Sequence, residues 1–409
     1  MVISKRNWLK IIGKKNPLTP FEKGGIFVPP FSKGVRGFFL NLWRILDKKN
    51  SLKSKFLIPL TIFFMLALNC LYAQKTPLAT YKLEGKWHFI ASDGSTLFAP
   101  QLLDEVTSFK EGYFRVMKKI NNKEKWYFLD SLGETAVTPD CDYVFDYSEG
   151  LALTVNNLDE QKLQNKFGFI DQNGKQVIPM IYNDAESFSE GLAYAAGNET
   201  RGWLDKKGNF VITLKTKVNG YTFHDGLAMI SNSEYKIGFV DKHGNEVIPL
   251  IFDEAGSFSE GLAFANTGYK LGYIDGKGKL VIPAQFDYCD DFHNGVAFVG
   301  FLDKRNAITY GAIDKTGKFT IPFKFEKARS YSEGLAAVKL DGKWGYVDVM
   351  GSFTLMHQFS AANSFINGLA FAENKEENKI GFINKKGEFI VILPKCEHVV
   401  DLRLNKLVY

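Results

Sequence analysis

Seven aspartates recur at one place in a repeated pattern, and they are the first residues that could do chemistry. They are Asp130, Asp171, Asp205, Asp241, Asp275, Asp314 and Asp348. Carboxylates stacked at one structural position could form a ladder of calcium sites, because calcium prefers oxygen ligands. A calcium loop needs further carboxylates at alternate positions, however, and Lys206-Lys207-Gly208 offers none. Each Asp directly precedes a glycine-containing turn, where its side chain accepts hydrogen bonds from the backbone. The pattern therefore predicts turn stabilisation and no metal site.

A second acidic position precedes the glycine of a recurring Ser-Glu-Gly-Leu block. Glutamate occupies it at Glu149, Glu190, Glu260 and Glu333, and Asp225, Asn294 and Asn367 occupy it elsewhere. A general acid or base could not become an asparagine and keep its chemistry. This position is therefore predicted to be structural.

The histidines give no catalytic or metal-binding pattern. None of His88, His224, His243, His293, His357 and His398 pairs at a ligand spacing such as H-x-x-x-H. His224 and His293 share one slot of the pattern, which indicates a solvated turn. The chain also has no phosphate-binding loop, no dinucleotide fingerprint and no G-x-S-x-G motif. We predict a non-enzymatic protein with no catalytic residues, no cofactor and no metal.

The elements that carry these residues form a tandem repeat. A Gly-aromatic-aliphatic-Asp/Asn block begins at Gly168, Gly202, Gly238, Gly272, Gly311, Gly345 and Gly381, with spacings of 34, 36, 34, 39, 34 and 36 residues. The Ser-Glu-Gly-Leu block keeps the same pace. Two markers in step over this many periods identify about nine copies of one unit.

Each copy reads as a three-stranded antiparallel meander. A Leu-Ala-x-Val strand, a turn, a Trp-Gly-Tyr-Ile-Asp strand, a Lys-x-Gly-Lys turn and a β-branched third strand follow one another. Proline closes the third strand at Pro179, Pro249, Pro283 and Pro322, as suits a residue that cannot donate to a ladder. An aromatic residue in the following connector (Phe188, Phe258, Phe292 or Tyr331) is predicted to fill the space between adjacent meanders.

The segment Lys343-Trp344-Gly345-Tyr346-Val347-Asp348, with its Ser-Glu-Gly-Leu-Ala block, closely resembles the bacterial WG-repeat family. The resemblance covers about residues 78–409 and implies a binding or scaffold role without a defined activity. The Trp-Gly pair is intact only at Trp344-Gly345, whereas His88 and Tyr127 follow Trp87 and Trp126 where glycine is expected. Strands in the first two units are therefore predicted to pack differently.

The number of units favours an open array over a closed ring. Nine copies exceed the four to eight blades that propellers typically have, and three strands fall short of the usual four. We therefore predict an all-β, open, twisted array with capped ends, with a closed propeller-like ring as the alternative. The tail Leu407-Val408-Tyr409 resembles a spare copy of the first strand, Leu78-Ala79-Thr80-Tyr81, and either caps the last unit or closes the ring.

The N-terminal part is predicted to be removed or unfolded. Residues 51–73 combine Lys53 and Lys55 with an apolar run, which is the pattern of a secretory signal cleaved between Ala73 and Gln74. Residues 1–50 precede it, although a signal normally begins at the N-terminus, and segment 16–37 looks like a translated intergenic repeat, which indicates a start site placed too far upstream. Cys70 raises lipid anchoring as an alternative, although Asn69 fits a lipidation site poorly. We expect an exported protein of the periplasm, outer envelope or extracellular space.

Charge and cysteine content restrict the partners further. Residues 1–73 hold 13 Lys/Arg and two acidic residues, so the remainder has 38 basic and 43 acidic residues and a net charge of −5. Nucleic-acid binding needs a basic surface, so no nucleic-acid partner is expected. Cys141, Cys289 and Cys396 lie far apart and are predicted to be unpaired, buried thiols.

Function should depend on what differs between units, because the recurring residues build the scaffold. Two segments between strands stand out, 156–165 and 301–309, since both are longer than their counterparts. Binding residues concentrate in loops on rigid scaffolds. We predict a protein-interaction scaffold of the cell envelope, with a glycan-binding envelope protein as the alternative. A row of exposed Trp or Tyr at equivalent positions would favour the alternative.

Overall fold

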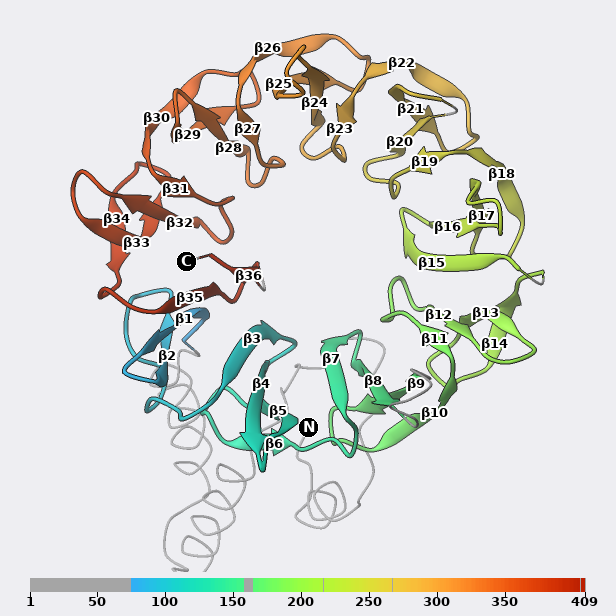
Figure 1. The fold of residues 1–409 in the computed structure, drawn as a ribbon, viewed down its shortest axis with the longest axis horizontal. Helices are drawn as coiled ribbons and strands as arrows, with labels where there is room; N and C mark the ends of the chain where they lie inside the picture. Colours follow the sequence, from blue (N-terminus) through green and yellow to red (C-terminus); the bar gives the residue numbers. More distant parts are fainter. Residues whose placement is uncertain (1–74, 158–164, 216, 267, 405, 409) are drawn as a thin grey trace, which may run out of the picture. The chain divides into compact units, whose positions relative to one another are not determined.

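The computed structural model describes residues 75–157, 165–215, 217–266, 268–404 and 406–408. The expected leader with its Ala73–Gln74 cleavage site, Cys70 and residues 1–50 lie outside the described residues and stay predictions. Most of segment 156–165 and Tyr409 also lie outside the described residues. In the described part, 36 strands form nine four-stranded antiparallel sheets, which follow one another around a central axis as the blades of a propeller (Figure 1). The described residues include no helix long and apolar enough to cross a membrane.

Eight blades are built from consecutive strands, and within each the first strand lies nearest the axis. Blade 1 contains β3 (Glu105–Lys110), β4 (Tyr113–Ile120), β5 (Lys123–Leu129) and β6 (Thr135–Val137), and blade 2 contains β7 (Tyr143–Ser148), β8 (Leu151–Asn157), β9 (Asn165–Asp171) and β10 (Gln176–Tyr182). Blade 3 contains β11 (Asp184–Ala185), β12 (Ala193–Ala196), β13 (Arg201–Leu204) and β14 (Phe210–Thr213), and blade 4 contains β15 (Asn219–His224), β16 (Leu227–Ser231), β17 (Ile237–Asp241) and β18 (Glu246–Phe252). Blade 5 contains β19 (Glu254–Ala255), β20 (Leu262–Asn266), β21 (Leu271–Asp275) and β22 (Leu280–Phe286), and blade 6 contains β23 (Tyr288–Cys289), β24 (Val296–Leu302), β25 (Ile308–Asp314) and β26 (Phe319–Phe325). Blade 7 contains β27 (Lys327–Ala328), β28 (Leu335–Leu340), β29 (Lys343–Asp348) and β30 (Phe353–Phe359), and blade 8 contains β31 (Ala361–Ala362), β32 (Leu369–Asn374), β33 (Lys379–Asn384) and β34 (Phe389–Ile392).

Blade 9 joins the two ends of the propeller and shows that the open-array prediction is wrong. It has the order β2 (Lys86–Ala91), β1 (Pro77–Leu83), β35 (His398–Asp401) and β36 (Lys406–Leu407). The antiparallel pair β1–β35 runs from Ala79 opposite Asp401 to Lys82 opposite His398. An open array would leave these edges unpaired, and closure satisfies their backbone groups. The alternative of a closed ring is the arrangement present, but the strand that meets β1 is β35, and the described part of the tail, β36, pairs with β35 and not with β1.

The predicted three strands are the second, third and fourth strands of each blade. The innermost strand was missed because in five blades it has only two residues, as in β11. The prediction that proline ends the third strand also needs correction. Pro179 lies inside β10, where the register with β9 shifts between Ile178 and Tyr182. Proline is tolerated there because the outermost strand has a free edge, so its missing N–H breaks no ladder.

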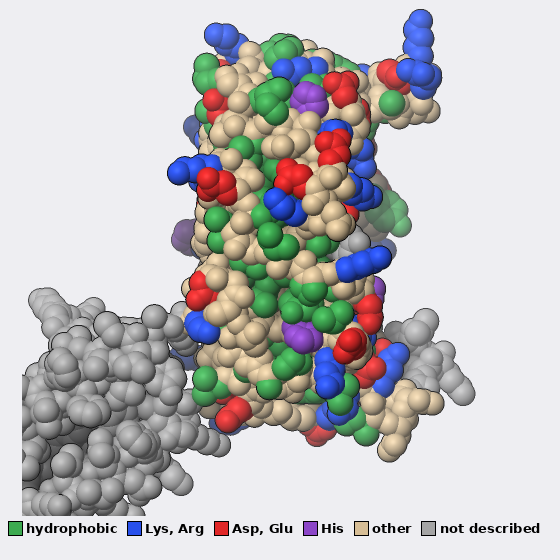
Figure 2. All heavy atoms as spheres, turned by 90° about the vertical axis from the view of Figure 1, so that its left-hand side faces the viewer, with side chains coloured by type: hydrophobic (Ala, Val, Ile, Leu, Met, Phe, Trp, Pro, Cys, Tyr) green, Lys and Arg blue, Asp and Glu red, His purple; other side chains and the backbone are tan. Residues whose placement is uncertain are grey.

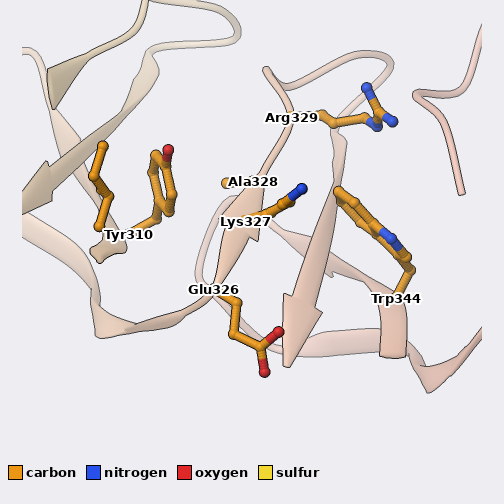
Figure 3. A pocket seen from close by; sticks show the side chains of 7 residues that line it. Tyr310, Glu326, Lys327, Ala328, Arg329 and Trp344 are labelled. Atoms are coloured by element: carbon orange, nitrogen blue, oxygen red, sulfur yellow. The ribbon is translucent and has the colours of Figure 1, made fainter. Parts of the chain in front are cut away.

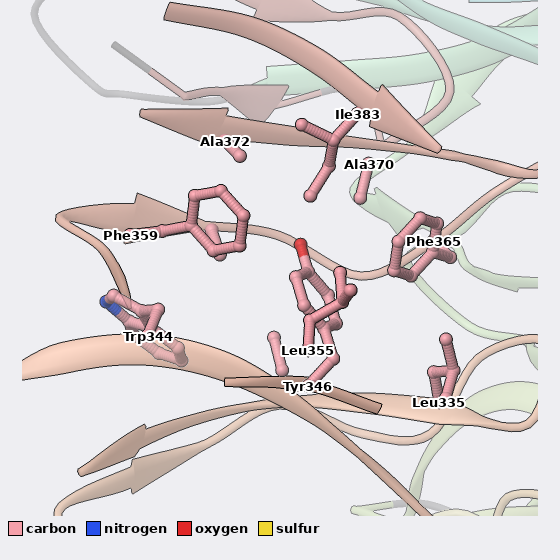
Figure 4. Close-up of a cluster of buried hydrophobic side chains, with 11 residues drawn as sticks. Leu335, Trp344, Tyr346, Leu355, Phe359, Phe365, Ala370, Ala372 and Ile383 are labelled. Carbon is pink, nitrogen blue, oxygen red and sulfur yellow. The ribbon is translucent and has the colours of Figure 1, made fainter. Parts of the chain in front are cut away.

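The hydrophobic core lies between blades. Nine clusters of buried side chains each draw on two neighbouring blades, and Figure 4 shows the one between blades 7 and 8. The aromatic residues predicted to fill these junctions are buried, with relative exposures of 0–4% for Phe188, Phe258, Phe292 and Tyr331. Phe188 contacts Phe169 of the preceding blade, with ring centroids 5.0 Å apart. The predicted inter-unit role of these aromatics is confirmed.

The recurring glycine allows the third and fourth strands to approach each other. A Cβ at Gly345 would lie 2.7 Å from the backbone nitrogen of His357 and from the Leu355 oxygen. Gly168, Gly202, Gly238, Gly272, Gly311 and Gly381 would meet the backbone of the outermost strand in the same way. The residues in the glycine position of the first two units, His88 and Tyr127, face less regular outer segments: residues 96–101 bridge to β2 only at Trp87 and Ile90, and β6 pairs with β5 only at Phe128 and Leu129. The different packing predicted for those two units is therefore present.

Antiparallel order places the connections on two faces. The turn between the first and second strands and the turn between the third and fourth lie on one side, which we call the latch face. Hairpin tips between the second and third strands, and the connectors between blades, lie on the opposite side, which we call the tip face.

Candidate functional site

Aspartates on the latch face hold the turns between the third and fourth strands. In each of the seven, Oδ1 accepts hydrogen bonds from the backbone N–H groups two and four residues ahead. For Asp241 both distances are 2.9 Å. The predicted turn role is confirmed. Within the residues that the structure describes, no group of three or more His, Cys, Asp or Glu could hold a metal.

The acidic residue before the turn glycine connects neighbouring blades. Glu190, with φ +53°, accepts a hydrogen bond at 3.1 Å from the N–H of Gly226 in the next blade. Lys242, from that same blade, contacts the Glu190 carboxylate at 2.9 Å and donates to the Glu190 carbonyl at 3.1 Å. We call this arrangement a latch. It gives the predicted structural position a definite role.

Latches come in a long and a short form. Lysine completes the four long ones, in the pairs Glu149–Lys206, Glu190–Lys242, Glu260–Lys315 and Glu333–Lys385. The short latches have no lysine. Asp225 accepts from the glycine N–H of the next blade with Gly276 in the lysine position, and Asn294 does so with Val349 in that position. In these latches lysine thus occurs only opposite a glutamate, although Glu111, which accepts from the Gly150 N–H, has Gln172 in the lysine position.

The contacts of the long latches determine the charge state of their glutamate carboxyl groups. Burial opposes the charged form of Glu190, but the Lys242 ammonium and the Gly226 N–H outweigh it and hold the pKa below the ordinary glutamate value. Burial likewise opposes the charge on Glu260, and the Lys315 ammonium with the Gly295 N–H lowers its pKa. Both carboxylates are therefore charged at neutral pH.

Histidines and cysteines form no reactive group in the described part. His224 is exposed, His293 is half-buried, and His88 stacks on Tyr81 with centroids 4.8 Å apart. All three cysteines are free, although only Cys289 is fully buried, while Cys141 and Cys396 are half-buried. Burial raises the pKa of Cys289 to about 12 and that of Cys141 to about 11. These thiols are protonated at neutral pH and are poor nucleophiles.

The tip face differs from blade to blade. Two residues join the strands at Glu84-Gly85, Asn121-Asn122 and Asp341-Gly342, whereas five join them at 232–236 and 303–307. The predicted long segment 301–309 is an extended hairpin rather than a long loop. Phe301 pairs with Thr309 and Leu302 with Ile308, so the inserted residues add strand. Phe301 also packs on Phe323, with centroids 4.6 Å apart.

A pocket opens on the tip face beside this hairpin, between blades 6 and 7. Its volume is about 430 Å³, and its lining residues are Ile308, Tyr310, Glu326, Lys327, Ala328, Arg329 and Trp344. Figure 3 shows the Lys327 side chain extending between the rings of Tyr310 and Trp344, with the Glu326 carboxylate directed away from them. The Arg329 guanidinium lies 5.0 Å from the Trp344 ring centroid. The predicted scaffold residue Trp344 is thus also a wall of this pocket.

A second tip-face pocket lies between blades 1 and 2, beside the start of segment 156–165. It has a volume of about 580 Å³ and is lined by Ile120, Lys123, Glu124, Lys125, Asp140, Cys141, Asp142 and Asn156. Its acidic and basic side chains alternate. One described residue of each segment that the sequence singled out, Ile308 and Asn156, therefore lines a pocket.

The predicted scaffold tryptophans Trp87 and Trp126 are buried, with relative exposures of 3% and 5%. Sequence reasoning missed two exposed aromatics, Tyr235 and Tyr269, at neighbouring hairpin tips on the tip face; they are 84% and fully exposed. Both stand three residues before the recurring glycine, in Tyr-Lys-Ile-Gly and Tyr-Lys-Leu-Gly. Aligning the units at that glycine would have found them.

Exposed apolar side chains also follow the outer wall of the ring. Val177, Ile181, Val247, Ile251, Met356 and Ile392 on the outermost strands are each more than a third exposed. Figure 2 shows hydrophobic side chains between charged ones on the wall of blades 7 to 9. Because they recur from unit to unit, they belong to the scaffold and do not distinguish one blade from another.

Comparison with known proteins identifies the repeat. The WG containing repeat family matches residues 128–157, 167–195, 237–270, 272–304, 310–344 and 344–377. No curated protein matches the chain. Among solved structures, BamB from Moraxella catarrhalis is 12% identical with a TM-score of 0.39, over 73% of this chain and 97% of that one.

Two further solved structures are similar at the same level. The uncharacterized protein lmo1340 from Listeria monocytogenes is 10% identical with a TM-score of 0.36, over 75% of this chain and 93% of that one. The β-propeller domain of the trilobed protease from Pyrococcus furiosus is 9% identical with a TM-score of 0.33, over 61% and 97%. These values are too low to carry an argument about function.

Proposed function

Because this chain belongs to the family of proteins with WG containing repeats, we propose that its propeller is a non-enzymatic scaffold that binds a protein partner through the tip face. One observation carries the proposal. The latch face repeats the same turns, whereas hairpin lengths, both pockets and the exposed Tyr235 and Tyr269 differ between blades on the tip face. Recognition needs residues that are not the same in every unit.

The test shortens the hairpin of blade 6. Replacing residues 302–308 by Asn-Gly links Phe301 to Thr309 through a two-residue turn, the same turn length that Asp341-Gly342 already has in blade 7. Phe301 keeps its packing, and loop shortening of this size changes closure by only about 0.6 kcal/mol. Affinity capture from the source cells should then lose the partner while the thermal midpoint stays unchanged. Lys277→Gln, on the latch face, is the matched control and should retain the partner.

Site of action is part of the same proposal. The pattern of residues 51–73 supports export to the cell envelope with cleavage after Ala73. Intact-mass analysis of envelope fractions should find a chain that begins near Gln74. A mature protein that retains residues 16–37 would contradict export by this signal.

Glycan binding is the second candidate, and Tyr235 and Tyr269 are the observation that favours it. They are exposed tyrosines at equivalent positions of neighbouring blades, although two residues do not make a row. A Tyr235→Ala/Tyr269→Ala protein that loses binding on a glycan array but keeps its protein partner would assign the tip face to glycans.

A further inference from the structure

The pocket between blades 6 and 7 carries cations that its own acids do not neutralise. Glu326 accepts from the Gly342 N–H at 2.9 Å and lies 3.8 Å from Lys339. Asp303, at the neighbouring tip, accepts from the N–H groups of Arg305 and Ala307 at 2.7 and 2.9 Å. Both carboxylates therefore already have partners, Glu326 in the turn between β28 and β29 and Asp303 in its own turn, where its Oδ2 also lies 3.7 Å from Arg305 Nε.

Lys327 and Arg329 are left facing the pocket. Across the described ranges, Lys327 makes no ion pair or side-chain hydrogen bond. Arg329 donates its Nε–H to the Ala362 carbonyl at 3.0 Å and stacks on Trp344. Partial burial lowers the pKa of Arg329, which is the direction that an incoming anion would reverse.

The same two positions are not basic in the neighbouring units. Asp184 and Glu186 occupy them in blade 3, Glu254 and Gly256 in blade 5, Tyr288 and Asp290 in blade 6, and Ala361 and Asn363 in blade 8. The basic pair is thus a departure of blade 7 from the repeat, in a body whose net charge is −5. The scaffold does not require it.

Aromatic walls complete the site. Tyr310 of blade 6 and Trp344 of blade 7 stand on either side of Lys327 (Figure 3). Lys304 and Arg305 at the adjacent tip are exposed and add positive charge where a ligand would approach. The volume of about 430 Å³ lies within the range of small ligand sites and suits a few side chains rather than a folded surface.

Deepening the proposed function on which it rests, we propose that this pocket binds an acidic peptide segment of the partner. Carboxylates of the segment meet Lys327 and Arg329 beside Trp344, and an aromatic side chain next to them packs against the Tyr310 ring. Charge-assisted hydrogen bonds and aromatic contact together select such a sequence over a neutral one.

The test uses the folded chain labelled with 5-fluorotryptophan, with the Trp344 resonance assigned from a Trp344→Phe variant. The probe is an acetylated, amidated Glu-Glu-Phe-Glu-Glu peptide, and its control is Gln-Gln-Phe-Gln-Gln. The acidic peptide should shift the Trp344 resonance and the neutral one should not. Lys327→Gln should weaken binding about tenfold, the usual effect of losing one charge-assisted hydrogen bond. Lys279→Gln, which removes an exposed lysine from the latch face, should leave binding unchanged.

Equal weakening by Lys279→Gln would overturn the site, because it would show only attraction by net charge. A shift caused by a heparin tetrasaccharide but not by the peptide would overturn the assignment to a peptide. The proposed function fails separately. If the peptide does not bind and partner capture still depends on the blade 6 hairpin, the pocket is wrong and the tip face stands. If the peptide binds, and neither the shortened blade 6 hairpin nor Lys327→Gln reduces partner capture, the proposed function of the tip face is wrong.

Discussion

The two faces of the ring are built from the same strands and follow opposite rules. On the latch face, each acidic residue before the turn glycine reaches the next blade, as Glu190 does with Gly226. On the tip face, the described turns vary from two to five residues, and the two pockets differ in charge. Fixed geometry on one face leaves the other free to vary. The difference is the reason why we attribute assembly to the latch face and propose recognition for the tip face.

Blade 9 shows how far the latch face controls assembly. Arg403 forms a buried ion pair with Asp401, with Nη2 and Oδ2 2.7 Å apart, and donates to the carbonyls of Ile366 and Leu369 at 2.5 and 2.9 Å. Those carbonyls flank the latch-face turn of blade 8. Arg403 therefore ties blade 9 to blade 8 where the ordinary latch is replaced.

The largest expected effect follows from breaking this contact between blades 8 and 9. Arg403→Met leaves the Asp401 carboxylate buried without its partner, which should cost about 3–5 kcal/mol of unfolding free energy. Chemical denaturation measures the loss. The double variant Arg403→Met/Asp401→Leu removes the whole pair and should recover most of it, because apolar replacements of a buried pair are often close to neutral. A single variant as stable as the wild type would show that the ring does not depend on this contact.

Trp344→Ala should have the next largest effect, since it removes a buried aromatic that is only 9% exposed. The expected cost is about 3 kcal/mol. In a closed ring, loss of one inter-blade cluster weakens every blade, so hydrogen exchange should rise around the whole propeller. Exchange that rises only in blades 7 and 8 would indicate independent units. Trp344→Phe, which keeps an aromatic ring, is the milder control.

Breaking the long latches should have a smaller, pH-dependent effect. The pKa values of Glu190 and Glu260 are lowered in the folded state, so their contribution is present above the ordinary glutamate pKa and is lost as pH falls through the folded pKa. Each pair is partly exposed and should contribute about 0–1 kcal/mol. Glu190→Gln/Glu260→Gln should therefore lower stability at pH 7 and flatten its decline between about pH 5 and pH 3. An unchanged acid profile would refute the role of these charges.

The sequence was informative where structure is local. Periodic patterns of a few residues are enough to predict the aspartate turns, the strand of each Trp-Gly block and the burial of Phe188. The two-residue strand β11 has no period to detect. Ring closure depends on β1 meeting β35 from the opposite end of the domain, which no local pattern encodes. Lys327 and Arg329 are visible only when the units are aligned and compared position by position.

The central claim is that a partner binds the tip face and leaves the latch face free. Blade 5 offers a matched pair of exposed turn residues, Tyr269 on the tip face and Lys277 on the latch face. A photo-crosslinking amino acid placed at each position in the intact chain, and activated in the source cells, measures the claim directly. If the partner binds the tip face, position 269 yields a crosslinked partner and position 277 yields only background. A partner captured from position 277 alone, or equally from both, would contradict it.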